Sequence, residues 1–303
     1  MHLSDAALAH LRRVVDEPSL AGTPYRLVGL LGRGGMGAVW EVVDERLARA
    51  VALKVVDDPR GDSLGSACLR DEARTIARLE HPGLLPVHDV GRLADGRTYY
   101  VMKLVRGRRL DAWCAEHRAL DERLVGFERI VQTVAFAHAR GVVHRDLKPG
   151  NVMVGEFGEW LVLDWGLALI GGEREPEGTI VGTAGYMAPE QARGEVAATD
   201  ARADVYALGR ILAELLADAT PRPSRRLLAI AAKASATEPV ERYAAADALA
   251  DDLARERAGR RVQALRETPL DWLARCHRRY AAAIWLVVAY LVMRVLAILV
   301  WPG

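Results

Sequence analysis

The chain has 303 residues, a length that accommodates one large hydrophobic core or two lobes. Its apolar content of 51% and charged content of 27% are ordinary for a globular protein, and a formal net charge of +1 argues against a general nucleic-acid binder. Cys68, Cys114 and Cys276 are far apart and odd in number, so they predict neither a disulfide framework nor a metal site and suit a reducing cytoplasm.

The first segment, Met1–Glu17, places its apolar residues on one face of a short helix that Pro18 ends. This helix either packs on the domain or acts as a docking or regulatory arm. No apolar core follows a basic start, so the sequence predicts no signal peptide.

A glycine-rich stretch then lies between two apolar runs that alternate like strands. It reads Leu31-Gly32-Arg33-Gly34-Gly35-Met36-Gly37-Ala38-Val39, a G-x-G-x-x-G-x-V pattern. Glycines let backbone amides approach phosphate oxygens because no Cβ intervenes. The pattern alone could equally be a dinucleotide-binding turn. A strand, Trp40–Val43, follows where that turn needs a helix, so we expect a hairpin.

The next run, Val51–Val56, is an apolar strand with one lysine in it. Lys54 must therefore pair with an acid or extend its amine to the surface. The helix predicted over Leu69–Leu79 offers Glu72 as its best-placed carboxylate, although other acids lie nearby. Further strands are expected over Leu84–Val90 and Arg97–Val105, and helices over Leu110–His117 and Leu124–Arg140.

The chain is organised around the octet His144-Arg145-Asp146-Leu147-Lys148-Pro149-Gly150-Asn151, called here the central loop. Asp146 can accept a proton from an attacking hydroxyl. Lys148 can steady a moving phosphoryl group, and Asn151 can ligate Mg²⁺. These three side chains make a compact phosphoryl-transfer set.

Three more motifs follow the central loop. A predicted strand, Trp160–Leu163, leads into Asp164-Trp165-Gly166. Gly182–Glu190 reads GTAGYMAPE, and Asp204–Gly209 reads DVYALG at the start of a helix that runs to Ala217.

Taken in this order, the motifs over Tyr25–Ala258 resemble those of the bacterial Hanks-type (eukaryotic-like) serine/threonine protein kinases. The resemblance implies an α+β, bilobal protein-kinase fold, with a small β-rich N-lobe, a larger mostly helical C-lobe, and Mg-ATP between them. It implies transfer of the γ-phosphoryl group of ATP to a Ser or Thr hydroxyl of a protein. Two alternatives remain: a pseudokinase scaffold, disfavoured by the complete motif set, and a small-molecule phosphotransferase of related fold, disfavoured by Lys148 and by Gly182–Glu190.

The resemblance also implies which residues form the site. Asp146 and Lys148 would be catalytic, and Asn151 and Asp164 would hold Mg²⁺, with Mn²⁺ as an alternative ion. Lys54, held by Glu72, would grip the α- and β-phosphates. The remaining nucleotide contacts are expected from the hairpin, its neighbouring strand, the hinge and the pocket floor: Leu31, Gly32, Arg33, Gly34, Gly35, Met36, Gly37, Val39, Ala52, Met102 (at the gatekeeper position), Lys103, Val105 and Met153.

Other residues are expected to support the site rather than to act in it. The resemblance implies that Thr183 bonds to Asp146 and Lys148, that Glu190 forms a buried pair with Arg242, and that Asp204 holds the backbone of the central loop. Trp165 stands where the family norm is Phe. Its larger ring should make the flipped, inactive arrangement harder to accommodate.

A switch is expected near Arg145, because in the family such an Arg commonly receives a phosphorylated loop residue. Related kinases usually carry Thr where this chain has Glu175 and Glu177, which leaves Thr179 as the remaining candidate for phosphorylation. A carboxylate carries less charge than a phosphate, so it would order the loop more weakly. The alternative is a solvated acidic loop that touches nothing.

Only Asp218–Ser224 separates the helix ending at Ala217 from the next, predicted over Arg225–Ala236. Kinase domains usually place a loop and a further helix in that gap. The C-lobe is therefore expected to be shortened, with less substrate selection.

The C-terminal part changes character. Arg255–Arg279 carries eight arginines against three acids, and Ala281–Trp301 is apolar except for Arg294. We expect a transmembrane helix, with Arg294 reaching the far interface and the basic flank in the cytoplasm. An apolar helix folded onto the domain or a partner is the alternative.

The predicted organisation is an N-terminal helical extension (1–24), N-lobe and hinge (25–105), C-lobe (106–258), basic juxtamembrane segment (259–280) and transmembrane helix (281–301). The kinase would face the cytoplasm from the cell membrane. Its partners would be Ser/Thr protein substrates and no nucleic acid, and a homodimer would serve autophosphorylation.

Overall fold

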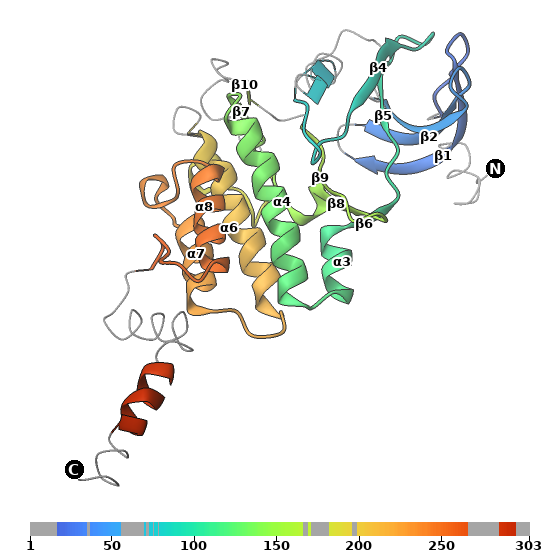
Figure 1. Ribbon diagram of the computed structural model, residues 1–303. Coiled ribbons are helices and arrows are strands. Elements are labelled where there is room, and N and C mark those ends of the chain that lie inside the picture. The colour runs from blue at the N-terminus through green and yellow to red at the C-terminus, as the bar shows by residue number, and fades with distance from the viewer. Residues whose placement is uncertain are drawn as a thin grey trace, which may run out of the picture.

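The computed structural model describes residues 17–34, 37–55, 79–165, 182–195, 199–265 and 285–294, the positions 70, 73, 74, 76 and 77, and the backbone of 169–170. Within these residues the chain forms two lobes, one built on a β-sheet and one built mainly of helices (Figure 1). The predicted bilobal α+β arrangement is therefore confirmed.

The N-lobe is one antiparallel sheet in the order β1-β2-β3-β5-β4. Its strands are β1 (Tyr25–Gly34), β2 (Gly37–Asp44), β3 (Arg49–Val55), β4 (Val87–Arg92) and β5 (Thr98–Lys103). Alternate residues of β2 are buried, as the period of a half-buried strand requires. Trp40, Leu53 and Val101 lie at the centre of this core. The glycine-rich stretch is the expected hairpin, since Gly34 pairs with Gly37 across β1 and β2.

The C-lobe consists mostly of helices with short strands beneath the hinge. Its helices are α3 (Leu110–Glu116), α4 (Leu120–His138), η1 (Pro149–Asn151), α5 (Pro189–Ala192), α6 (Ala201–Ala217), α7 (Arg225–Ala234), η3 (Pro239–Glu241) and α8 (Ala246–Arg257). Its strands are β6 (Gly107–Arg109), β7 (Val142–Val143), β8 (Val152–Gly155), β9 (Trp160–Val162) and β10 (Leu169–Ile170). Strands β6, β8 and β9 form one small sheet, and β7 pairs with β10.

The core of the C-lobe lies between α4, α6, α7 and α8, which pack side by side (Figure 1). Phe127 and Ile130 of α4 and Leu208 and Ile211 of α6 are completely buried there. Gly209 allows α6 and α7 to approach closely, because a Cβ at this position would lie 2.6 Å from the amide nitrogen of Ser235.

No helix separates α6 from α7, and the two helix boundaries at Ala217 and Arg225 agree with those expected from the sequence. The connection is held by its backbone: Leu120 N donates to Thr220 O, and Thr220 N donates to Arg118 O. After α8 the chain still packs on the C-lobe as far as residue 265. Val262 is buried there, and the amide of Gln263 donates to Asp252.

Several expectations fall outside the described residues. These are the N-terminal helix over residues 1–16, Gly35, Met36, Glu72, and the loop that carries Glu175, Glu177 and Thr179. Of the apolar segment 281–301, the structure describes 285–294, which is helical. Among the described residues, none of the helices combines the length and the apolar character needed to cross a membrane.

Candidate active site

A cleft of about 750 Å³ lies between the two lobes. The hairpin of β1 and β2 covers it, β3 and β5 form its back, and the central loop forms part of its floor. Every predicted site residue that the structure describes lines this cleft. These are Leu31, Gly32, Arg33, Gly34, Gly37, Val39, Ala52, Lys54, Met102, Lys103, Val105, Asp146, Lys148, Asn151, Met153 and Asp164.

Three side chains of the central loop and its surroundings form a closed hydrogen-bonded set. Lys148 Nζ donates to Asp146 Oδ2 at 2.8 Å and to Thr183 Oγ1 at 2.6 Å. The Thr183 hydroxyl donates to the other carboxylate oxygen of Asp146, also at 2.6 Å. The expected bonds of Thr183 are therefore present. They fix the Asp146 carboxylate, and they bring a lysine ammonium beside it.

Asn151 is oriented by the same carboxylate. Its side-chain nitrogen donates to Asp146 O at 2.8 Å and to Asp146 Oδ2 at 3.1 Å. Asn151 lines the cleft, and because its side-chain nitrogen is committed, its side-chain oxygen is left as an acceptor. An amide oxygen and a carboxylate are the kind of ligand that Mg²⁺ prefers. The donors present therefore suit this ion.

Asp164 faces the same cleft from the segment after β9. Its carboxylate is 47% exposed, and Lys54 Nζ of β3 lies 3.3 Å from Oδ1. Lys54 itself is almost completely buried. Asp164 has φ +56, in the left-handed region that non-glycine residues rarely adopt. Its backbone is thus held in a conformation that aims the carboxylate into the cleft.

The backbone of the central loop is held from beneath by Asp204 at the start of α6. The amides of His144 and Arg145 donate to its two oxygens at 2.7 and 2.8 Å, and His138 Nε2 lies 2.9 Å from Oδ2. Complete burial raises the pKa of Asp204, but these hydrogen bonds outweigh that effect and hold the pKa below its ordinary value. A buried carboxylate therefore stays ionised and anchors the loop, as expected from the sequence.

Arg145 adopts φ +69, a strained value for a side chain with a Cβ. The strain is accommodated because both of its backbone groups are fixed. Asp204 accepts from its amide, and Gln191 Nε2 of α5 donates to its carbonyl at 3.1 Å. The side-chain oxygen of Gln191 in turn accepts from the amide of Ala188 at 3.1 Å. Helix α5 thus buttresses the central loop.

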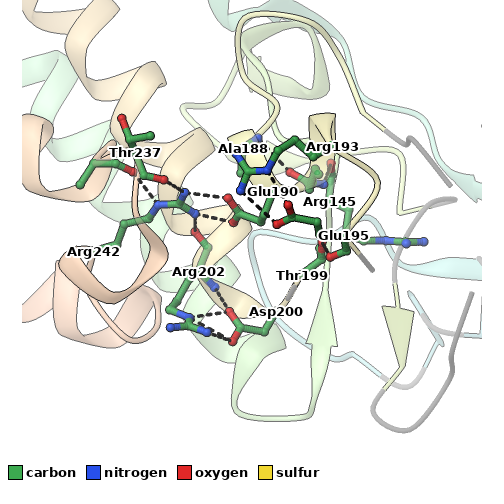
Figure 2. A network of polar contacts seen from close by, with 12 residues as sticks. Arg145, Ala188, Glu190, Arg193, Glu195, Thr199, Asp200, Arg202, Thr237 and Arg242 are labelled. Carbon is green, nitrogen blue, oxygen red and sulfur yellow. Dashed lines mark hydrogen bonds and ion pairs between the residues drawn. The ribbon is translucent and has the colours of Figure 1, made fainter. Parts of the chain in front are cut away.

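Helix α5 is itself fixed by the pair that the sequence predicted. Figure 2 shows Arg242 facing Glu190, with Nη1 and Nη2 at 2.6 and 2.8 Å from the two carboxylate oxygens. Both side chains are fully buried. Arg242 also donates to the carbonyls of Arg202, Ala236 and Thr237. One arginine therefore joins α5, α6 and the segment after α7.

Trp165 is fully buried next to Asp164. Its indole nitrogen donates to Val162 O at 3.2 Å, and its ring lies 4.6 Å from that of His144, centroid to centroid. His144 Nε2 in turn lies 2.9 Å from Leu163 O. The indole hydrogen bond is one that a phenylalanine could not make.

Sequence reasoning missed Arg106 and Arg109, which line the cleft, and Tyr186, which does not. Arg106 pairs with Glu41 of β2 at 3.2 Å and so links the two lobes. Arg109 donates to Gly150 O of the central loop. Tyr186 donates to Glu214 of α6 at 2.8 Å, and burial and that carboxylate raise the pKa of Tyr186. Because these partners are distant in sequence, no local pattern signals them.

The comparisons with known proteins agree with this geometry. The family model of the protein kinase domain matches residues 25–260. The serine/threonine-protein kinase PknA of Mycobacterium tuberculosis is 36% identical over 277 residues, covering 81% of this chain and 64% of that protein. The DNA damage-responsive serine/threonine-protein kinase RqkA of Deinococcus radiodurans is 39% identical over 213 residues, covering 67% and 31%. The chain thus spans less than two thirds of the length of these curated relatives. The crystal structure of the PknI kinase domain of M. tuberculosis is similar with a TM-score of 0.59 at 28% identity, covering 77% of this chain and 96% of that one.

Proposed function

The chain belongs to the protein kinase family, and from that premise we propose that it is an active serine/threonine kinase. It transfers the γ-phosphoryl group of ATP to Ser or Thr hydroxyls of proteins. The observation that carries this proposal is the closed set of Asp146, Lys148 and Thr183 beside the oriented Asn151. A scaffold that only binds partners has no need to hold a carboxylate and an ammonium in this arrangement.

The proposed roles follow from the contacts of each side chain. Asp146 accepts the proton of the acceptor hydroxyl as its oxygen attacks phosphorus and the bond to the ADP oxygen breaks. Lys148, 2.8 Å from Asp146, neutralises charge on the transferring group. Asn151 and Asp164 would hold Mg²⁺ through their oxygens. When bound, the ion supplies neutralisation of the phosphate charge. Lys54, between the sheet and Asp164, contacts the nucleotide phosphates.

The nucleotide itself is proposed to lie under the hairpin of β1 and β2. Gly32, Gly34 and Gly37 allow the backbone amides of the hairpin to approach the phosphates. The hinge backbone at Lys103 and Val105 binds the adenine. Met102, Ala52 and Met153 supply the apolar walls. Glu72 remains the proposed partner of Lys54.

The test is phosphotransfer from labelled ATP by the purified full chain, with and without a generic protein substrate. Replacing Asp146 by Asn should lower the rate by about 10²–10⁴-fold while ATP still binds, because the hydroxyl loses its base. Lys54→Met should also abolish transfer. The matched control is Asp121→Asn at the exposed start of α4. Wild-type autophosphorylation in the Asp146 and Lys54 variants would refute the assignment, and ATP binding without transfer in the parent would indicate a pseudokinase.

We also propose that the C-terminal segment anchors the kinase in the cell membrane, with the catalytic lobes in the cytoplasm. The apolar run 281–301 and the arginines before it support this proposal. The described helix within it, 285–294, exposes its large apolar side chains, including Trp285 at 63% and Leu286 at 72%. Removing 281–303 should release an active protein into the soluble fraction. A full chain that stays soluble without detergent would contradict the anchor.

A further inference from the structure

One end of the C-lobe carries an excess of arginines drawn from separate parts of the chain. Arg222 lies in the connection after α6, Arg225 begins α7, and Arg260 and Arg261 follow α8. These four residues are called the basic end. All four are exposed, and none forms an ion pair with a described residue. The charge stands out because the whole chain carries a formal net charge of only +1.

The fold, rather than the sequence, brings these residues together. Helices α7 and α8 pack side by side, on the part of the C-lobe remote from strands β1–β5 (Figure 1). The first turn of α7 meets the last turn of α8, because the hydroxyl of Ser224 donates to Glu256 at 2.8 Å. The chain then turns at Gly259, which has φ +64, and the amide of Arg260 donates to the carbonyl of Arg255.

The acids nearby are fewer than the arginines of the basic end. Glu256 accepts from the Ser224 hydroxyl, a neutral group that does not cancel the charge of a carboxylate. Asp252 is completely buried, where it lies 3.9 Å from Arg255 and accepts from Tyr243 and from the backbone after α8. Arg257 has its own partner, Glu128, at 2.7 Å. The four arginines of the basic end outnumber Glu256 and Asp252, so positive charge remains in excess there and is available to an anionic partner.

We propose that the basic end docks the C-lobe on the anionic phospholipid headgroups of a membrane. Guanidinium groups bind phosphate oxygens through paired hydrogen bonds, so their chemistry fits such headgroups. The chain also leaves the basic end at residue 265 for an Arg-rich stretch and then the apolar run. This inference rests on the proposed anchor, which would keep the membrane within reach. It adds that the folded lobe lies on the bilayer and that the cleft, between the lobes, stays accessible to substrates.

The experiment places the full chain in lipid nanodiscs of phosphatidylcholine alone or with phosphatidylglycerol added. Amide hydrogen exchange is then compared over 220–228 and 258–263. We expect slower exchange in the anionic discs, with no change over β2, and loss of the difference at high salt, where charges are screened within about 3 Å. Equal exchange at the basic end in both kinds of disc would overturn the proposal and leave the anchor intact.

Variants test whether the arginines cause the effect. Arg222→Ala with Arg225→Ala should weaken docking about 25-fold, since each basic residue contributes about fivefold near an anionic surface. The matched control replaces Arg26 and Arg49, which are exposed on the N-lobe sheet, and should leave docking unchanged. Undiminished docking in the Arg222 and Arg225 variant would refute the assignment.

Two further results separate the alternatives. If the chain does not enter neutral discs, the proposed anchor fails. Sedimentation with phosphatidylglycerol vesicles, lost in the double variant, would then still support the basic end, and no sedimentation would overturn it. If soluble glycerophosphoglycerol protects the same amides as well as a bilayer does, the surface binds free phosphate compounds and the membrane assignment is wrong.

Discussion

The buried pair of Glu190 and Arg242 should be the most sensitive single contact in the C-lobe. Both side chains are excluded from water, with exposures of 1% and 0%, and the guanidinium serves three backbone carbonyls besides the carboxylate. Arg242→Ala would leave Glu190 as a buried charge without its partner. Breaking such a pair costs about 3–5 kcal/mol. For a domain of this size, that corresponds to a fall in Tm of roughly 6–20 °C.

The assay is denaturant and thermal unfolding of the full chain, with kinase activity measured alongside. Activity should fall at temperatures below the new Tm, because Glu190 lies in the first turn of α5, which buttresses the central loop through Gln191. The control is Arg193→Ala, which removes a half-exposed ion pair with Glu195 and should change stability by less than about 1 kcal/mol. An effect of Arg242→Ala no larger than that of the control would refute this reasoning.

A double variant separates the charge from the shape of the site. Replacing both Glu190 and Arg242 by Met removes both charges, so no buried ion is left without a partner. Such replacements are often nearly neutral in stability. The double variant should therefore be more stable than Arg242→Ala alone. If it is equally unstable, the lost bonds to the backbone carbonyls dominate and the ion pair contributes little.

The remaining predictions concern three other residues. Trp165→Phe deletes the hydrogen bond from the indole nitrogen to Val162 O. It should therefore lower the free energy of unfolding by about 1 kcal/mol and reduce the rate of phosphotransfer. An unchanged urea midpoint and an unchanged rate would contradict this. Burial raises the pKa of the Cys114 thiol to about 11, so at pH 8 only about one molecule in a thousand carries the thiolate. Iodoacetamide should therefore modify Cys114 in unfolded protein but not in native protein, which peptide mass spectrometry can measure. The hydrogen bond from Arg123 lowers the pKa of Asp218. The contact therefore stabilises the fold at pH values above the ordinary carboxyl pKa, and this stabilisation is lost as the pH falls through the lowered pKa. In acid titrations of Asp218→Asn, the free energy of unfolding should fall less steeply below about pH 5 than it does in the parent.

Residues close together in sequence were the ones whose geometry could be predicted best. Asp146, Lys148 and Asn151 lie within one loop, so a short backbone and a common chemical task leave few arrangements for them. Thr183 and Arg242 are distant in sequence. Their partners could still be predicted, because the resemblance supplied pairings that the residues alone did not.

Arg123 shows where sequence reasoning ended. It lies in α4, four residues before Phe127, and the predicted helix began one residue after it. The structure buries it almost completely, where it donates to the carbonyls of Cys114, His117 and Leu215 and to Asp218 at 2.5 Å. An arginine in an amphipathic helix is ordinarily a surface residue. Its burial depends on carbonyls from α6 and the loop after α3, which no local pattern reveals.

The same arginine explains how α6 can pass to α7 without a helix between them. The connection contributes only Ala219 to the buried apolar core, so polar groups close most of this end. Arg123 donates hydrogen bonds to the carbonyls where α3 and α6 end, and Thr220 pairs through its backbone with Arg118 and Leu120. A buried donor with several acceptors is rigid, because moving it leaves each acceptor without its bond. The connection is therefore a fixed part of the C-lobe, and it holds Arg222 and Arg225 in place at the basic end.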